Sequence, residues 1–385
     1  MSAPLYLDYN ATTPVDERVL DAMLPFFREH FGNPSSEHAP GWIADEAVTK
    51  AREQTARVIG ATPRTMTFTS GATESISLAI RGAGAVYGGR RHRIVTVQTE
   101  HKAVLKTCEA MEREGYETTY LPVDANGLVD LAAIEAALDE ETFLVSVMWG
   151  NNETGVVQPI PEIAELAHAA GAIMMTDATQ AVGKLPISVN HDGVDLLALS
   201  GHKMYGPKGV GALYTRQRGP RVKLQPQVTG GGQEAGMRGG TVNVPGVVGL
   251  GEAAHIARRA QEEDAERMEA LRDRFEAAVL EAVPGTVVNA ADAPRLPNTT
   301  SLRFDGVRAA QLLPVMSGVA ASLGAACQSP HRTPSHVLKA MGLTDDQALA
   351  TVRFSLGRPT TEAEVDAAVG HIVEATQTVR RRLAA

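Results

Sequence analysis

The chain has 385 residues, of which 44% are hydrophobic and 21% charged, and its formal net charge is −9. This composition is typical of a soluble globular protein, and the length predicts two domains. The acidic balance argues against direct binding of nucleic acid, because phosphate contacts need a basic surface. No apolar run is long enough to span a membrane, and the first residues lack a signal-peptide pattern, so we expect a cytoplasmic protein.

Apolar runs typical of buried strands alternate with helical segments between about residues 50 and 215. Such continuous runs suit strands covered on both faces, as in a mostly parallel α/β sheet. Polar residues follow each run, at the edge of the sheet where open α/β folds bind ligands. The sequence therefore predicts one site assembled from five loops. The expected strands, in chain order, are 66–69, 93–97, 143–148, 172–176 and 195–199.

A smaller mixed α+β region follows. We expect a charged helix over about 253–282, short strands at 286–288 and 300–304, and a closing helix from about Glu362. The domain boundary is placed near residue 255. Residues 16–255 then form a large domain, and residues 1–15 join 256–385 in a small domain.

Lys203 is the first candidate for chemistry. It follows the strand 195–199 directly, where partial desolvation would lower the pKa of its amine and suit Schiff-base formation. Taken alone, a surface lysine in a Gly/Pro loop is the better reading. Asp177 makes the Schiff-base role of Lys203 the better reading. A buried carboxylate after a strand is the usual partner of the ring nitrogen of pyridoxal 5′-phosphate (PLP), a cofactor that binds to a lysine. Asp177 could otherwise cap the next helix.

The segment 70–74 opens a helix with small residues. Free backbone N–H groups at such a turn bind a phosphate, and Thr73 adds a hydroxyl, although a simple helix cap has the same pattern. The glycine-rich segment 230–241 is either a second phosphate loop or a flexible connection. His101 could stack on a cofactor ring or move protons, although a lone histidine is more often structural.

Cys327 and Cys108 are the two cysteines of the chain, too few for a disulfide framework and without metal-ligand spacing, so we expect no metal site. Cys327 lies among small residues near His331 and Arg332, where a thiolate would be a good nucleophile. Cys108 lies in an expected helix and suits packing. Arg353 could hold a carboxylate through two parallel hydrogen bonds, with a surface ion pair as the alternative.

Together these segments resemble a cysteine desulfurase of the NifS/IscS type. The resemblance extends over nearly the whole chain, and so many ordered matches make a chance similarity implausible. The matching segments are 7–14, 31–35, 69–75, 99–105, 151–155, 177–180, 200–209 and 353–358.

The resemblance implies a fold-type I PLP homodimer with a mostly parallel seven-stranded sheet in its large domain. Lys203 would carry the cofactor, Asp177 would pair with the ring nitrogen, and His101 would stack on the ring. Arg353 would bind the substrate carboxylate with Asn152, and Asn33 is a further candidate near the substrate. The other implied cofactor contacts are Ala72, Thr73, Asn152, Gln180, Ser200, His202 and, from the other subunit, Thr241.

The implied reaction converts L-cysteine to L-alanine. Lys203 would remove the α-proton, and Cys327 would take the sulfur as a persulfide and pass it to an acceptor protein. An aminotransferase or a selenocysteine lyase would not need Cys327, and a scaffold without PLP is a non-enzymatic alternative. The resemblance is nearest to the DndA type and predicts sulfur supply for DNA phosphorothioation without direct DNA contact. General iron–sulfur cluster assembly is the alternative pathway.

One segment departs from the family pattern. Relatives have a run of Ser and Gly before the cysteine, whereas this chain has Leu323 four residues before Cys327 and Pro330 three residues after it. A bulky leucine and a proline should stiffen this segment. A stiffer segment would restrict how far Cys327 can move between PLP and the acceptor protein.

Overall fold

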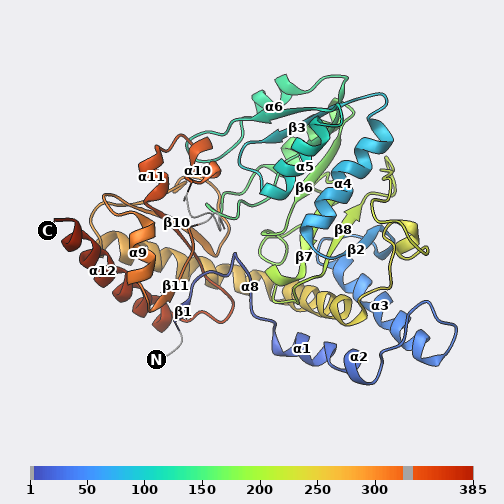
Figure 1. The fold of residues 1–385 in the computed structure, drawn as a ribbon, viewed down its shortest axis with the longest axis horizontal. Helices are drawn as coiled ribbons and strands as arrows, with labels where there is room; N and C mark the ends of the chain where they lie inside the picture. Colours follow the sequence, from blue (N-terminus) through green and yellow to red (C-terminus); the bar gives the residue numbers. More distant parts are fainter. Residues whose placement is uncertain (1–3, 324–332, 385) are drawn as a thin grey trace.

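The computed structural model describes residues 4–323 and 333–384 (Figure 1). Its large domain is built on a seven-stranded sheet of order β2-β8-β7-β6-β5-β3-β4. Only β8 runs antiparallel to its neighbours, so the predicted mostly parallel α/β sheet is confirmed. The strands are β2 (Met66–Thr69), β3 (Arg93–Val97), β4 (Glu117–Leu121), β5 (Thr142–Ser146), β6 (Ile173–Asp177), β7 (Leu196–Ser200) and β8 (Gly211–Thr215).

Helices cover both faces of this sheet, which explains the continuous apolar runs. In β5, Val145 packs on one face with α3 (Ala39–Arg57), α7 (Ile160–Ala169) and α8 (Val244–Ala282). Leu144 packs on the other face with α4 (Ala72–Tyr87) and α5 (Lys102–Glu112). Cys108 belongs to the second of these clusters. The helices of this domain are α1 (Glu17–Met23), α2 (Pro25–Arg28), α3 (Ala39–Arg57), α4 (Ala72–Tyr87), α5 (Lys102–Glu112), α6 (Leu131–Ala137) and α7 (Ile160–Ala169).

The small domain has its own core, and the start of the chain belongs to it. Leu7 is buried there with Phe275 and Phe354, and β1 (Leu5–Tyr6) pairs with β11 (Val319–Ala320). An antiparallel sheet has the order β12-β10-β9. Its elements are β9 (Thr286–Val288), β10 (Thr299–Phe304), β12 (Thr351–Ser355), α9 (Ala309–Val315), α10 (His336–Ala340), α11 (Asp345–Leu349) and α12 (Glu362–Ala384).

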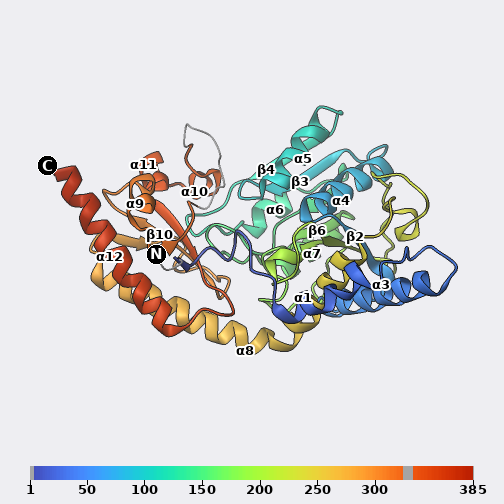
Figure 2. The same cartoon turned by 60° about the horizontal axis from the view of Figure 1, so that its bottom comes forward.

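A single long helix, α8 (Val244–Ala282), links the two cores (Figure 2). It begins before the expected residue 253, because its glycines serve helix packing rather than a loop. A Cβ atom at Gly249 would lie 2.5 Å from Met23 Sδ, and one at Gly251 would lie 2.6 Å from Ala51 Cα. The domain boundary proposed near residue 255 therefore falls inside this helix.

Candidate active site

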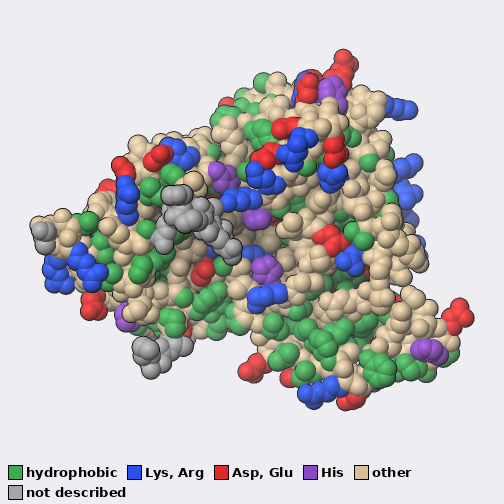
Figure 3. Space-filling model, in the orientation of Figure 1, with side chains coloured by type: hydrophobic (Ala, Val, Ile, Leu, Met, Phe, Trp, Pro, Cys, Tyr) green, Lys and Arg blue, Asp and Glu red, His purple; other side chains and the backbone are tan. Residues whose placement is uncertain are grey.

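A cavity of about 770 Å³ lies where the two domains meet. Because β2 and β7 are both antiparallel to β8, the loops after β2, β3, β5, β6 and β7 end at the same edge of the sheet. The small domain contributes Ser322, His336 and Arg353. Figure 3 shows the hollow near the centre of the molecule, surrounded by lysine, arginine and histidine side chains.

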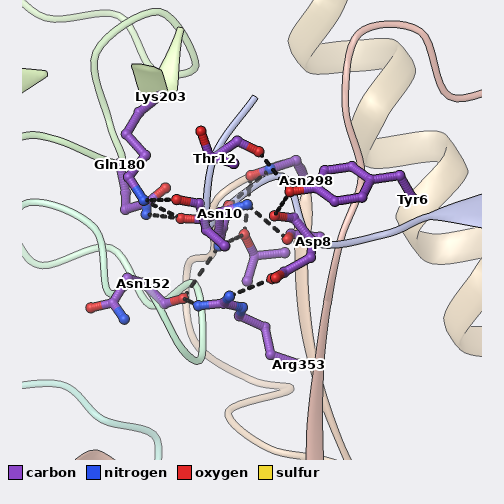
Figure 4. A network of polar contacts seen from close by, with 12 residues as sticks. Tyr6, Asp8, Asn10, Thr12, Asn152, Gln180, Lys203, Asn298 and Arg353 are labelled. Carbon is purple, nitrogen blue, oxygen red and sulfur yellow. Dashed lines mark hydrogen bonds and ion pairs between the residues drawn. The ribbon is translucent and has the colours of Figure 1, made fainter. Parts of the chain in front are cut away.

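Lys203 points into this cavity from a short helical turn after β7. Its Nζ donates to the carbonyl oxygens of Asn10 and Ala11, the latter at 2.8 Å (Figure 4). Burial, followed by the nearby Arg353 guanidinium, lowers the pKa of Lys203 to about 8. A neutral amine, which is the form that attacks an aldehyde, is therefore accessible close to neutral pH.

Loading of the cofactor-free enzyme with PLP should depend on this pKa. Below pH 8 the reactive neutral fraction of Lys203 rises about tenfold per pH unit, so the loading rate should rise with pH and level off above about pH 8. Stopped-flow absorbance between pH 6 and 9.5 measures this rate, with PLP in excess. A rate that keeps rising to pH 9.5 would mean that Lys203 keeps an ordinary lysine pKa.

Asp177 is buried at the end of β6 and lines the same cavity. One of its oxygens accepts from Thr179 N at 2.9 Å, and among the described residues it forms no ion pair. Glu100 is fully buried nearby, and burial, followed by the charge of Asp177, raises its pKa well above the usual range. Burial thus favours the protonated, uncharged form of Glu100 beside Asp177.

The first turn of α4 faces the cavity with its backbone. Gly71 precedes this turn with a φ of +149°, and no side chain caps the helix. Ala72 and Thr73 line the cavity there, together with Ser200 from the end of β7. Uncapped N–H groups at a helix N-terminus favour an anion such as a phosphate. His202 borders this region, and burial, followed by Lys203, lowers its pKa to about 4, so its ring is neutral.

His101 lies at the start of α5 and lines the cavity. Its Nδ1 accepts from Ala103 N at 3.1 Å, which leaves the hydrogen on Nε2. Burial lowers the pKa of the His101 ring; the negative charge of Asp177 opposes this shift, and the positive charge of Lys203 adds to it. A neutral ring of this kind can stack on a cofactor and still exchange a proton at Nε2.

Arg353 reaches the cavity from β12 of the small domain and is only 4% exposed. Its Nη1 donates to the Asn152 carbonyl at 2.8 Å, and its Nη2 lies 2.5 Å from Asp8 Oδ1 (Figure 4). Its Nε is buried without a partner among the described residues. Two contacts thus fix the guanidinium plane of a cationic residue that lines the cavity.

Asn10 is the residue that sequence reasoning missed. It is 1% exposed and joins the domains: its Nδ2 donates to Thr299 at 2.8 Å, and its Oδ1 accepts from Asn298 at 3.1 Å. Its carbonyl oxygen accepts from both Lys203 and Gln180. The polar run after the short strand β1 was the available signal, because polar residues also follow the strands that form the site.

Two predicted site residues do not line this cavity, and a third cannot be placed in it. Thr241 lines a separate cavity of about 290 Å³, and Asn33 lies in the exposed loop before α3. Cys327 lies outside the described residues. Leu323, just before that gap, packs against the small-domain core. The role of each of the three in the site stays a prediction.

Outside the cavity, the described residues offer neither a reactive thiol nor a metal site. Cys108 is fully buried, and burial raises the pKa of its thiol to about 12, so it is not a thiolate at neutral pH. In residues 4–323 and 333–384 no three His, Cys, Asp or Glu side chains gather as a metal site. No helix in those same ranges combines the length and apolar character needed to cross a bilayer.

Comparison with known proteins identifies the family. Residues 5–368 match the model of the class-V aminotransferases. A relative named cysteine desulfurase IscS, from Anaeromyxobacter sp. (strain Fw109-5), is 50% identical over 99% of this chain and 94% of its own length. The chain belongs to the cysteine desulfurases of the class-V aminotransferase family. These enzymes depend on PLP, and so does this one.

Solved structures agree with this assignment. A NifS-like protein superimposes with a TM-score of 0.90 at 39% identity, covering 97% of this chain and all of the other. DndA from Streptomyces lividans superimposes with a TM-score of 0.77 at 39% identity, covering 90% of this chain and 97% of its own. The predicted resemblance to the NifS/IscS type is thereby confirmed.

The residues of the cavity fit PLP. A lysine with a lowered pKa, a buried carboxylate without an ion pair and an uncapped helix N-terminus meet the needs of its aldehyde, ring nitrogen and phosphate. Thr179 adds a buried hydroxyl without a partner among the described residues, close to Asp177. The cavity edge therefore offers a complementary group for each part of the cofactor.

Proposed function

We propose that this enzyme converts L-cysteine to L-alanine and transfers the sulfur through Cys327 to an acceptor protein. The observation that carries the proposal is Arg353, a guanidinium held by two contacts in the same cavity as Lys203 and Asp177. An amino acid bound by its carboxylate there would present its α-carbon to the lysine. The relatives named cysteine desulfurase support cysteine as that amino acid.

Each residue of the site has its own role in the reaction. Bound PLP draws electrons from the substrate α-carbon. Arg353 holds the substrate carboxylate and so orients the α-carbon. The Lys203 amine takes the α-proton at Nζ, which its lowered pKa allows at neutral pH. His101 covers the ring and exchanges a proton at Nε2. Asp177 keeps the ring nitrogen protonated.

The sulfur transfer balances without an oxidant. The Cys327 thiolate attacks the substrate sulfur, an S–S bond forms, and the C–S bond breaks with its electron pair going to carbon. That carbon takes a proton and leaves as the methyl group of alanine, and Cys327 is left as a persulfide. Cys327 suits this role because Cys108, the other cysteine, is buried with a raised pKa.

The purified enzyme tests this proposal directly. Incubation with L-cysteine and a thiol reductant should release alanine and sulfide in equal amounts. Incubation with L-cysteine alone should leave one extra sulfur on the Cys327 peptide, which mass spectrometry detects. Release of pyruvate instead of alanine, or a keto acid formed by amino transfer, would reject the desulfurase assignment.

The destination of the sulfur has two candidates. Relatives named IscS, at 48–50% identity, support general iron–sulfur cluster assembly. The likeness to DndA, at 39% identity, supports the sequence prediction of DNA phosphorothioation. Labelling the enzyme with ³⁵S-cysteine and offering cluster-scaffold and phosphorothioation acceptors separately would distinguish them, because the true acceptor should compete best for the persulfide.

We also propose that the active form is a homodimer. Large apolar side chains are exposed together on α1 to α3, and Figure 3 shows hydrophobic side chains at the lower edge of the molecule over these helices. Phe31 is 77% exposed and Trp42 is 63% exposed. An exposed apolar patch of this kind marks a surface that another protein chain covers. A second copy would also place Thr241, which is outside its own chain's cavity, beside the neighbouring cofactor.

Trp42→Asp should weaken this dimer. A charge in a buried interface is costly, so we expect the dimer dissociation constant to rise by about 100-fold or more. Sedimentation velocity over a concentration series measures it. Leu280→Asp is the matched control, because Leu280 is exposed on α8 far along the chain from this patch. A monomeric wild type with full activity would contradict the dimer proposal.

A further inference from the structure

Lys184 is a buried lysine without a counter-ion. It is 8% exposed, and among the described residues no carboxylate forms an ion pair with it. Its Nζ donates to the backbone carbonyl of Gln180 at 3.0 Å and to the Gln180 side-chain oxygen at 3.1 Å. An apolar side chain would be the more stabilising choice for a purely structural position, because an uncompensated buried amine is unfavourable.

Those contacts determine how the Gln180 amide is turned. An ammonium group or amine N–H donates to oxygen, so the Gln180 atom beside Lys184 is Oε1 and its Nε2 lies on the opposite side. There Nε2 donates to the Asn10 carbonyl at 3.0 Å, and that carbonyl can only accept. Both ends therefore demand the same orientation. One Nε2 hydrogen remains for the main cavity, which Gln180 lines.

Lys184 also lies next to Lys203 in the interior. Both residues line a small cavity of about 10 Å³, which has room for no more than about one water molecule, and Lys203 also lines the main cavity. Burial, followed by the charges of Lys203 and Arg353, lowers the pKa of Lys184 to about 7. The contacts Lys184 to Gln180, Gln180 to Asn10 and Asn10 to Lys203 form one continuous chain of hydrogen bonds (Figure 4 shows its last two links).

We propose that Lys184 is a positioning residue of the active site, which holds the Gln180 amide so that an Nε2 hydrogen is presented to the bound cofactor. This inference rests on the proposed function and on the cofactor contact that the family resemblance implies for Gln180. Lys184 itself does not line the main cavity and acts through Gln180. Without it, only the Asn10 carbonyl orients the amide. Rotation that presents Oε1 to an oxygen atom of the cofactor then costs less.

A double-mutant cycle tests the proposal, with the PLP dissociation constant and the absorption maximum of bound PLP as readouts. Lys184→Met should weaken PLP binding by about tenfold and shift the absorption maximum, as should Gln180→Ala. In the Gln180→Ala background, Lys184→Met should have no further effect. Lys208→Met is the control: Lys208 lines the cavity without a hydrogen bond to Gln180, so its effect should be the same in both backgrounds.

Thermal unfolding separates positioning from folding. Lys184→Met should unfold at or above the temperature of the wild type, because the buried amine is replaced by an apolar group. Additive effects of Lys184→Met and Gln180→Ala, or an unchanged dissociation constant and spectrum in Lys184→Met, would overturn the inference. A wild type that binds PLP but makes no alanine from cysteine would overturn the proposed function and leave this inference standing.

Discussion

Lys203→Ala is expected to lower the rate of alanine formation by a factor of about 10³ or more. The substitution removes both the covalent attachment of PLP and the base that takes the α-proton, and each of these normally contributes several powers of ten. The purified variant should also be colourless after dialysis. Protein folding should be unaffected, because Lys203 forms no ion pair among the described residues and its Nζ bonds only to backbone carbonyls.

Lys223→Ala is the control for this variant. Its side chain lies on the surface after β8, so its activity should equal that of the wild type. Borohydride reduction of the wild type should place the pyridoxyl group on the peptide of Lys203. Lys184 is the informative alternative, since it is the other lysine with a strongly lowered pKa. A pyridoxyl group on Lys184 would overturn the assignment of both residues.

Cys327→Ser is expected to abolish the conversion of cysteine to alanine while PLP stays bound. A serine hydroxyl is a far weaker nucleophile towards sulfur than a thiolate, so the rate should fall by a factor of about 10³ or more. The cofactor contacts lie at the ends of the sheet strands, so the absorption spectrum should match the wild type. Alanine is measured by amino-acid analysis after a single turnover and after many.

Cys108→Ser separates this role from a general effect of losing a thiol. Its raised pKa and full burial in the core beside α4 and α5 exclude it from chemistry. We expect normal turnover and a loss of stability of about 1–2 kcal/mol, because a hydroxyl replaces a buried thiol. Alanine production that survives in Cys327→Ser but not in Cys108→Ser would reverse the assignment.

Much of the site was predictable from sequence because its signals are local. A buried strand produces a continuous apolar run, and the polar residue that ends it marks the carboxyl edge of the sheet. Asp177 and Lys203 were found in this way, and the cavity contains both. β8 and β4 were missed, because β8 follows a glycine-rich loop and β4 is a partly exposed strand at the sheet edge without a continuous apolar run.

The sequence by itself determined three things: which loops form the site and their order along the chain, which lysine is the candidate for carrying the cofactor, and the family resemblance. Only the tertiary structure brought Asp8 and Asn10 from the start of the chain to Arg353 and Lys203. Their partners lie 345 and 193 residues away, and no local pattern encodes such a pairing. The same holds for Lys184: whether a lysine is solvated or buried depends on what packs over it, and packing is a property of the whole fold.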